Sequence, residues 1–187
     1  MVQNGKRVDP TLILLWCRED IEAIRDQVSP THHSSGRFEL LTSFLWKNRT
    51  IAVDLNSEEI VCMGPIVTAR WRLINLKIPL GYYGNAFAIP GAVSKAGHIS
   101  TYPLTYALEL IKKAKNKVNE EYFRSPADLN VIKGRPNFIQ AWKFVMSNIF
   151  NVGFDKDFGW GEPKYGGVAN AHSFMGKGVN IPLNFVI

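Results

Sequence analysis

Residues 102–122 read YPLTYALELIKKAKNKVNEEY, and the apolar side chains in this stretch recur at every third or fourth position. Such spacing places them on one face of an α-helix and leaves the lysines on the other. The apolar series consists of Leu104, Ala107, Leu108, Ile111, Ala114, Val118 and Tyr122. The stretch therefore predicts one long amphipathic helix that covers a hydrophobic core.

The sequence on either side of this helix predicts further helices and short strands. Helices are expected over residues 20–28, 37–55 and 126–133. On the second of these, the side chains expected to face inward are Phe38, Leu41, Leu45, Ile51 and Ala52. Apolar and β-branched runs predict strands over residues 11–17, 59–72, 86–93, 141–147, 168–174 and 179–186. Pro65 lies in the second expected strand, where it implies a bulge or an edge position.

The order of these elements indicates the fold class. Helices and strands are mixed without the regular βαβ alternation of a doubly wound nucleotide-binding fold. We therefore expect an α/β protein of the α+β type, in which helices cover a mixed β-sheet. Residues 1–10 are expected to be a flexible N-terminus, and residues 11–187 a single domain, because the sequence contains no internal repeat, low-complexity tract or linker.

Composition and charge exclude several classes of function. The 187 residues are 46% hydrophobic and 20% charged, which is ordinary for a soluble domain. No apolar run approaches the roughly 18 residues that span a bilayer, so we expect a cytoplasmic protein without a membrane partner. The net charge of +6 would suit an anionic ligand such as coenzyme A. Nucleic-acid binding is not expected, because Lys112, Lys113, Lys115 and Lys117 form the solvated face of one helix and no nucleic-acid module is recognisable. A basic module for another polyanion is a weaker alternative.

The histidines and cysteines do not form a metal or hydrolase pattern. The four histidines are His32, His33, His98 and His172, and the two cysteines are Cys17 and Cys62. The histidines lack the spacing of metal ligands, and no Ser, Cys or Asp has an obvious base nearby in the sequence. Both cysteines lie in apolar runs and are expected to be buried structural thiols. No metal site is expected.

The motif DFGWG at residues 157–161 is the most distinctive short pattern. Its first three residues match the magnesium-binding tripeptide of kinases, but the glycine-rich loop, the V-A-I-K-like strand and the H-R-D-type loop are all missing, so a kinase is rejected. Two glycines around Trp160 predict a tight turn that can hold one large ring closely. Asp157 could accept backbone N–H groups there or pair with an arginine. A structural turn is the expected role.

The full motif, together with three longer segments, resembles a known family. These segments are RFELLTSFLWKNRTIA (37–52), TARWRLINLKIPLGYYGNAF (68–87) and YALELIKKAKNKVNEEYFRSPADLNVIKGRPNF (106–138). With DFGWG they resemble the BAHD acyl-CoA-dependent acyltransferases of plants, over nearly the whole chain from about Leu12 to Val186. Within that family the chain is most similar to the alcohol acyltransferase branch that contains benzyl alcohol O-benzoyltransferase.

The resemblance implies a two-domain protein with the chloramphenicol-acetyltransferase-like fold and an active-site channel between its domains. This chain would correspond to a truncated C-terminal domain. The family's H-x-x-x-D motif, whose histidine is the general base, belongs to the other domain. In this sequence the position four after each histidine holds Gly36, Arg37, Tyr102 or Gly176. No catalytic residue is therefore assigned, and the chain alone is expected to be inactive.

The implied activity is transfer of an acyl group, for example benzoyl, from acyl-CoA to an alcohol. Acyl-CoA would be a co-substrate, and no cofactor would be bound permanently. The implied partners are acyl-CoA, the acceptor alcohol, and the missing N-terminal domain or an intact homologue. The alternative is a non-catalytic truncated product, or a fragment that binds coenzyme A or another protein.

The resemblance also assigns residues to a site. The turn Asp157, Phe158, Gly159, Trp160 and Gly161 would border the coenzyme A channel as structure, with Arg70 as the partner of Asp157. Contacts to coenzyme A would come from Tyr83, Gly84, Asn85, Ser147 and Asn148. The sequence also lacks the family's longer hairpin after Gly167 and its final helix. If that hairpin supplies a strand, the neighbouring strands gain an open edge, and self-association or poor solubility is expected.

Overall fold

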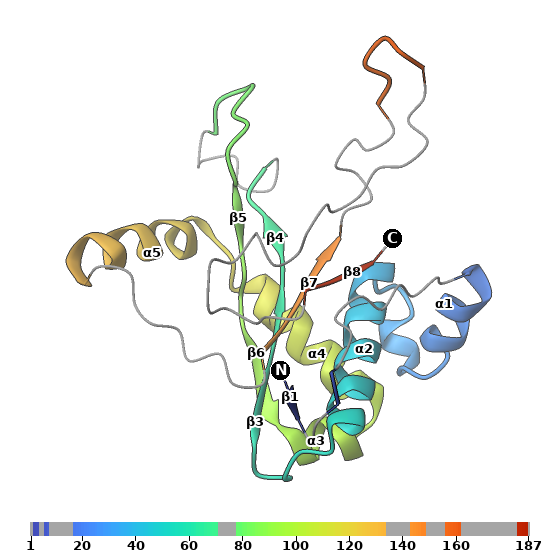
Figure 1. Cartoon of the computed structure of the whole chain (residues 1–187). Coiled ribbons are helices and arrows are strands. Elements are labelled where there is room, and N and C mark those ends of the chain that lie inside the picture. Colours follow the sequence, from blue (N-terminus) through green and yellow to red (C-terminus); the bar gives the residue numbers. More distant parts are fainter. Residues whose placement is uncertain are drawn as a thin grey trace.

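A mixed sheet of four strands lies at the centre of the part of the chain that the computed structural model describes, which is residues 2–3, 6–7, 17–70, 78–133, 143–148, 156–161 and 183–186. The strand order is β6-β3-β7-β8 (Figure 1). The strands are β3 (Ile60–Pro65), β6 (Ala92–Lys95), β7 (Lys143–Asn148) and β8 (Leu183–Val186). β6 is antiparallel to β3, whereas β7 and β8 continue in parallel, so the expected mixed sheet is confirmed.

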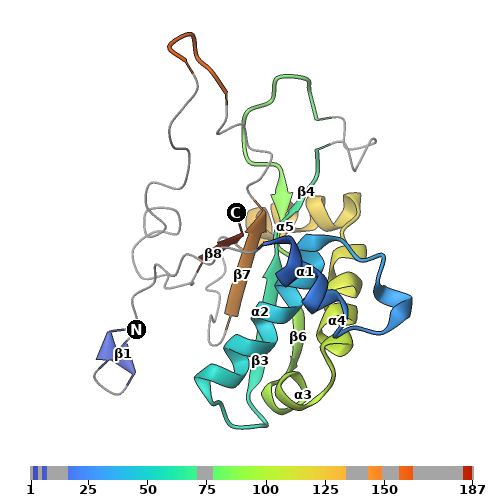
Figure 2. The same cartoon turned by 90° about the vertical axis from the view of Figure 1, so that its right-hand side faces the viewer.

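Three helices cover one face of this sheet (Figures 1 and 2): α2 (Arg37–Val53), α3 (Ala96–Thr101) and α4 (Leu104–Asn116). α1 (Arg18–Arg25) packs against α2, and the short 3-10 turn η1 (Pro30–His32) follows α1. α5 (Glu120–Lys133) projects to the side of the sheet (Figure 1). α2 and α4 lie against each other and both contact β3. Two further ribbons pair β1 (Val2–Gln3) with β2 (Lys6–Arg7), and β4 (Val67–Thr68) with β5 (Phe87–Ala88). The segment 1–10, which was expected to be flexible, thus includes a short antiparallel pair.

The core forms because alternate residues of the strands face the helices. Val61 and Met63 of β3, and Phe144 and Met146 of β7, are buried in one cluster with α2 and α4. β3 lies between two strands, so the edge position inferred from Pro65 is wrong. Pro65 is instead the last residue of β3, where the strand ends.

The burial of α2 differs from the periodicity argument at its C-terminal end. Leu41 is buried as expected, and Phe38 and Leu45 are partly buried against the core. Ile51 is 48% exposed and Ala52 is also exposed, so the inward placement of both is wrong. The reason is that the last turns of α2 are covered on one side alone, the side of the buried Trp46 and Thr50. Ile51 and Ala52 lie on the other side of the helix.

The long helix expected over residues 102–122 is two helices. α4 ends at Asn116, and α5 begins at Glu120 and runs through Pro126, so the break falls at residues 117–119. There the side chain of Asn119 accepts a hydrogen bond from the Tyr122 amide at 2.9 Å and thereby caps α5. Val118 is buried in a second, smaller cluster with Val67 and Ala88 of the β4–β5 ribbon. Helical spacing continues across the break, which is why the sequence did not show it.

Of the four lysines expected on one solvated helix face, Lys117 lies just after α4, and two of the other three are not solvated. Lys112 donates a hydrogen bond to the Ser35 hydroxyl at 2.8 Å. Lys115 forms a 2.6 Å ion pair with Glu39 of α2, and both side chains are mostly buried. Lys113 and Lys117 are exposed. The structure therefore uses half of this basic series to join α4 to α2 and to the segment before it.

Lys47 ties α2 to the C-terminal end of α3. Its Nζ donates hydrogen bonds to the carbonyl oxygens of Ile99, Ser100 and Tyr102, at 3.0, 2.8 and 2.7 Å. These carbonyls include ones that lack a partner at a helix end. The ammonium group is partly withdrawn from water, and this burial lowers the pKa of Lys47 below its usual value.

Replacing Lys47 with methionine is expected to lower the free energy of unfolding by about 1–3 kcal/mol, because charged hydrogen bonds to three carbonyls are lost while the side-chain volume is kept. Urea denaturation followed by circular dichroism would measure this. The matched control is Lys113→Met on exposed α4 surface, which should change the free energy by less than about 0.5 kcal/mol. Equal effects of the two changes would contradict the role given to Lys47.

Several other expectations are settled or lie outside the described residues. Cys17 is exposed at the start of α1, so its expected burial is wrong, whereas Cys62 is partly buried; neither is disulfide-bonded. No helix among the described residues combines the length and apolar character needed to cross a bilayer. The strand expected over residues 168–174, and all but Cys17 of the strand expected over residues 11–17, fall on residues that are not described.

Candidate functional site

Two loops that contain sequence-predicted site residues rise from the same end of the sheet (Figures 1 and 2). One is the segment 78–86 and the other is the segment 156–161. They share this end because β3 and β7 are parallel neighbours, with Pro65 beside Met146, so both strands end there. Ser147 and Asn148 are the last two residues of β7; Ser147 is partly buried and Asn148 is exposed. The fold thus collects all the predicted site residues at one end of the sheet.

Arg70 holds the segment 78–86 by its backbone. Its guanidinium donates hydrogen bonds to the carbonyl oxygens of Tyr82 and Gly84, at 2.6 and 2.7 Å. The guanidinium carbon also lies 5.7 Å from the centre of the Tyr82 ring, within the range of a cation–π contact. Below this contact the Ala69 amide donates to the Ala86 carbonyl at 2.8 Å, which continues the β4–β5 ladder. The loop is therefore fixed at two levels: at its base by the backbone bond between Ala69 and Ala86, and nearer its tip by the Arg70 side chain.

The two glycines of this segment have different roles. The Tyr82 amide donates to the Pro79 carbonyl at 3.1 Å, and Gly81, the third residue of that turn, has φ of +86°. This fits a type II turn, in which glycine is preferred at the third position. Gly84 does not have a positive φ; a Cβ there would lie 2.5 Å from the hydroxyl oxygen of Tyr82. A side chain at residue 84 would therefore displace the Tyr82 ring from its present position, a contact that the sequence did not reveal.

The remaining side chains of the segment face solvent. Tyr83 is 99% exposed, and Asn85 is exposed as well. Leu80, in the first half of the turn, is fully exposed too. Because Tyr82 and Gly84 shape the turn, the polar side chains that it presents to solvent are those of Tyr83 and Asn85. Of the three residues predicted to contact coenzyme A in this turn, Gly84 can offer mainly backbone.

Asp157 organises the second loop. Its Oδ1 accepts hydrogen bonds from the amides of Gly159, Trp160 and Gly161, at 2.6, 3.0 and 3.0 Å. Gly159 and Gly161 have φ of +95° and +98°, a backbone conformation that favours glycine. The carboxylate and the two glycines therefore explain the D-x-G-x-G part of the motif as a turn, one of the two roles considered for Asp157.

The other expectations for this loop are not met among the described residues. Arg70 and Asp157 form no ion pair there, because Arg70 is bonded to the carbonyls of its own loop and Asp157 to the amides of its own turn. The rings of Phe158 and Trp160 are 87% and 99% exposed, so the close packing of a large ring in the turn is wrong for this chain. The turn forms by local hydrogen bonds and does not need a ring to fill it.

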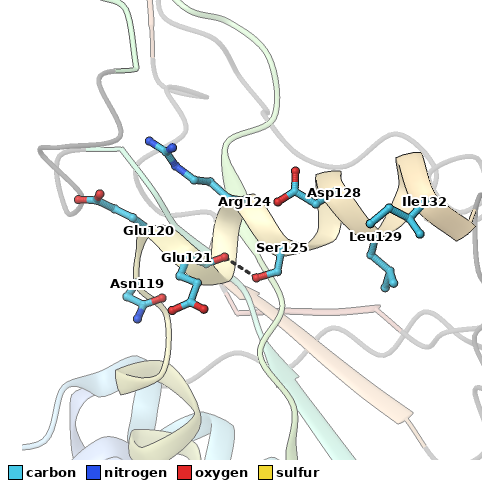
Figure 3. A pocket seen from close by; sticks show the side chains of 8 residues that line it. All are labelled: Asn119, Glu120, Glu121, Arg124, Ser125, Asp128, Leu129 and Ile132. Carbon is cyan, nitrogen blue, oxygen red and sulfur yellow. Dashed lines mark hydrogen bonds between the residues drawn. The ribbon is translucent and has the colours of Figure 1, made fainter.

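A hollow of about 880 Å³ lies elsewhere, along one side of α5 (Figure 3). It is lined by Asn119, Glu120, Glu121, Arg124, Ser125, Asp128, Leu129 and Ile132. Seven of the eight residues lie along α5, from Glu120 at its start to Ile132 near its end, and Asn119 precedes the helix. None is a predicted site residue. Three carboxylates against one guanidinium would repel the phosphates of coenzyme A, so we do not assign a ligand to this hollow. In the described part of the chain, no group of three or more His, Cys, Asp or Glu side chains is arranged so that it could hold a metal ion.

The chain is similar in sequence to plant acyltransferases. A profile described as the Transferase family matches residues 7–184. Alcohol acyl transferase 1 allele GSc of Malus domestica is 46% identical over 156 residues, which cover 82% of this chain and 34% of that protein. Benzyl alcohol O-benzoyltransferase of Petunia hybrida is 48% identical over 151 residues, 80% of this chain and 33% of that protein. The chain thus spans about one third of the length of the curated relatives it matches.

Solved structures share the fold at much lower identity. F. graminearum TRI101 complexed with coenzyme A and deoxynivalenol has a TM-score of 0.57 and 16% identity, and covers 78% of this chain and 36% of its own. Vinorine synthase has a TM-score of 0.55 and 19% identity, with 79% and 35% covered. The expected likeness to the chloramphenicol-acetyltransferase-like fold is confirmed. On the match over residues 7–184 and the identity to these relatives, the chain belongs to the Transferase family, the BAHD acyltransferases.

Proposed function

We propose that this chain is part of an enzyme that transfers an acyl group from acyl-CoA to an alcohol, with benzoyl as the first acyl group to test. The observation that carries the proposal is the 48% identity over 151 residues to a protein named benzyl alcohol O-benzoyltransferase. In support, a fold neighbour with a TM-score of 0.57 was solved with coenzyme A. Residues 11–187 would form one domain of this enzyme, in the cytoplasm, with no permanently bound cofactor.

The proposed reaction needs a base that this sequence does not contain. In the family mechanism, the H-x-x-x-D histidine removes the proton of the acceptor hydroxyl, and the oxygen attacks the thioester carbonyl. The C–S bond then breaks, the ester is released, and the coenzyme A thiolate takes up the proton. No histidine of this chain is followed by aspartate at the fourth position. The partner that supplies the base would be an N-terminal domain or an intact homologue.

The chain itself would contribute to binding. Its proposed contacts to acyl-CoA are Tyr83, Gly84, Asn85, Ser147 and Asn148, at the end of the sheet where both loops rise. The Asp157 turn would border the same channel as structure. For the isolated chain we propose a non-catalytic state, because a domain without the base can at most bind the donor.

A domain exchange tests the proposed function. The chain would replace the matching 151 residues of the Petunia hybrida benzyl alcohol O-benzoyltransferase, and the hybrid would receive benzoyl-CoA and benzyl alcohol. We expect benzyl benzoate, detected by chromatography with mass spectrometry, at a rate that depends on both substrates. A folded hybrid that forms no ester from benzoyl-CoA, acetyl-CoA or any tested alcohol would refute the proposal.

A further inference from the structure

Beyond the contacts proposed above, the structure suggests which residues shape the turn and which residue meets the ligand. Arg70, Tyr82 and Gly84 contact one another, whereas the side chain of Tyr83 points into solvent. Arg70 bonds the carbonyl oxygens of Tyr82 and Gly84, and its guanidinium carbon lies 5.7 Å from the centre of the Tyr82 ring. The hydroxyl of that ring lies 2.5 Å from the position that a Cβ on Gly84 would take. The Tyr83 side chain has 99% of its surface exposed. We call the three connected residues, Arg70, Tyr82 and Gly84, the turn clamp.

We propose that Arg70 is a positioning residue: through the turn clamp it holds the segment 78–86 in one conformation, in which Tyr83 is offered to the coenzyme A part of an acyl-CoA. This proposal rests on the proposed function, and it adds which residue contacts the ligand and which residue positions the turn. Arg70 and Tyr82 would not touch the ligand. Tyr83 would contact it with its ring, and Arg70 would act through the backbone of that residue's two neighbours.

The chemistry of arginine suits this role. A planar guanidinium can donate to two acceptors at once, and two charge-assisted hydrogen bonds fix the direction of both carbonyls. Because the carbonyls belong to the residues before and after Tyr83, they also set the orientation of the Tyr83 backbone. A lysine would keep the charge but presents a single ammonium group. Fixing the turn before binding reduces the ordering cost that the ligand would otherwise meet.

The first part of the test measures the turn without ligand. Hydrogen exchange of the full chain would be followed by mass spectrometry in peptides that include the Tyr82 amide, which donates to the Pro79 carbonyl. In Arg70→Met we expect exchange there to be about tenfold faster, and in Arg70→Lys an intermediate value. Gly84→Ala should also accelerate it, because the added Cβ displaces the Tyr82 ring while Arg70 is intact. Peptides from α4 should be unchanged, as should all peptides in the control Arg124→Met.

The second part measures binding of coenzyme A itself to the same proteins by calorimetry. Arg70→Met and Tyr83→Ala should each raise the Kd about fivefold or more, and the double variant should be no weaker than the weaker single one, since both act through Tyr83. Tyr83→Ala should leave the exchange of the turn unchanged, which separates contact from positioning.

Each result decides one part of the proposal. Unchanged exchange in Arg70→Met would overturn the turn clamp. Faster exchange with an unchanged Kd would overturn the positioning role. If the unmodified chain does not bind coenzyme A at millimolar concentration, the assignment of Tyr83 to this ligand is overturned, while ester formation by the hybrid enzyme would still decide the proposed function separately.

Discussion

Leu41→Ala is expected to lower the free energy of unfolding by about 2–5 kcal/mol, the range found when a buried leucine is cut back and a cavity is left. Leu41 is 1% exposed and belongs to the main core cluster between α2, α4 and the sheet. Shortening the Leu41 side chain removes apolar contacts from the cluster that packs the helices against the sheet. Urea denaturation monitored by circular dichroism would give the free energy and the slope together.

Ile51→Ala on the same helix is the matched control. Ile51 is 48% exposed, so the change should cost no more than about 0.5 kcal/mol beyond the small difference in helix propensity, which favours alanine. Helical spacing alone predicts that Leu41 and Ile51 both face the core, and so predicts similar losses of stability for the two variants. Similar losses for both variants would mean that the last turns of α2 are buried, in contrast to the structure described above.

The isolated 187-residue chain is expected to form no measurable ester from acyl-CoA and alcohol. Loss of a general base typically reduces a rate by about 10²–10⁴-fold, and the histidine census leaves no H-x-x-x-D base in this sequence. Purified chain would be incubated with benzoyl-CoA and benzyl alcohol, and released thiol and ester would be measured together. Ester formation that depends on acyl-CoA would contradict the non-catalytic state.

The hybrid enzyme described under Proposed function supplies the control for this experiment. Changing the histidine of its H-x-x-x-D motif to alanine should reduce ester formation by about 10²–10⁴-fold while the Kd for coenzyme A stays the same. His98→Ala within this chain should not change the rate: His98 stacks on the Tyr102 ring, with centroids 4.9 Å apart, and is assigned no chemical role. A large loss of ester formation in His98→Ala would mean that His98 acts as a base outside an H-x-x-x-D motif.

The periodic parts of the sequence were sufficient to predict most helices. α2 begins at Arg37 as expected and ends at Val53, and β7 occupies nearly the predicted residues. The break between α4 and α5 was missed, because an apolar residue at Val118 satisfies the helical pattern while its side chain is buried elsewhere. Side-chain spacing reports which face is apolar, and it does not report which element covers that face.

The candidate site shows the same division. The residue pattern of DFGWG, with an aspartate followed by two glycines, was enough to predict a turn, but it left two roles open for Asp157: accepting backbone N–H groups or pairing with an arginine. The Arg70–Asp157 pairing could not be judged from the sequence, because an arginine has many possible acceptors. In the structure the carbonyl oxygens of Tyr82 and Gly84, 12 and 14 residues along the chain, accept its hydrogen bonds.

From the sequence alone, the mixed α/β class, the family resemblance and the lack of a catalytic histidine motif could be established, because each depends on which residues are present and how they are spaced. The tertiary structure decided that Ile51 is exposed, that Lys115 is paired with Glu39, and that Arg70 holds the turn beside Tyr83. Each depends on which segments come together when the chain folds: a contact needs its partner nearby, and a side chain stays exposed where no segment covers it.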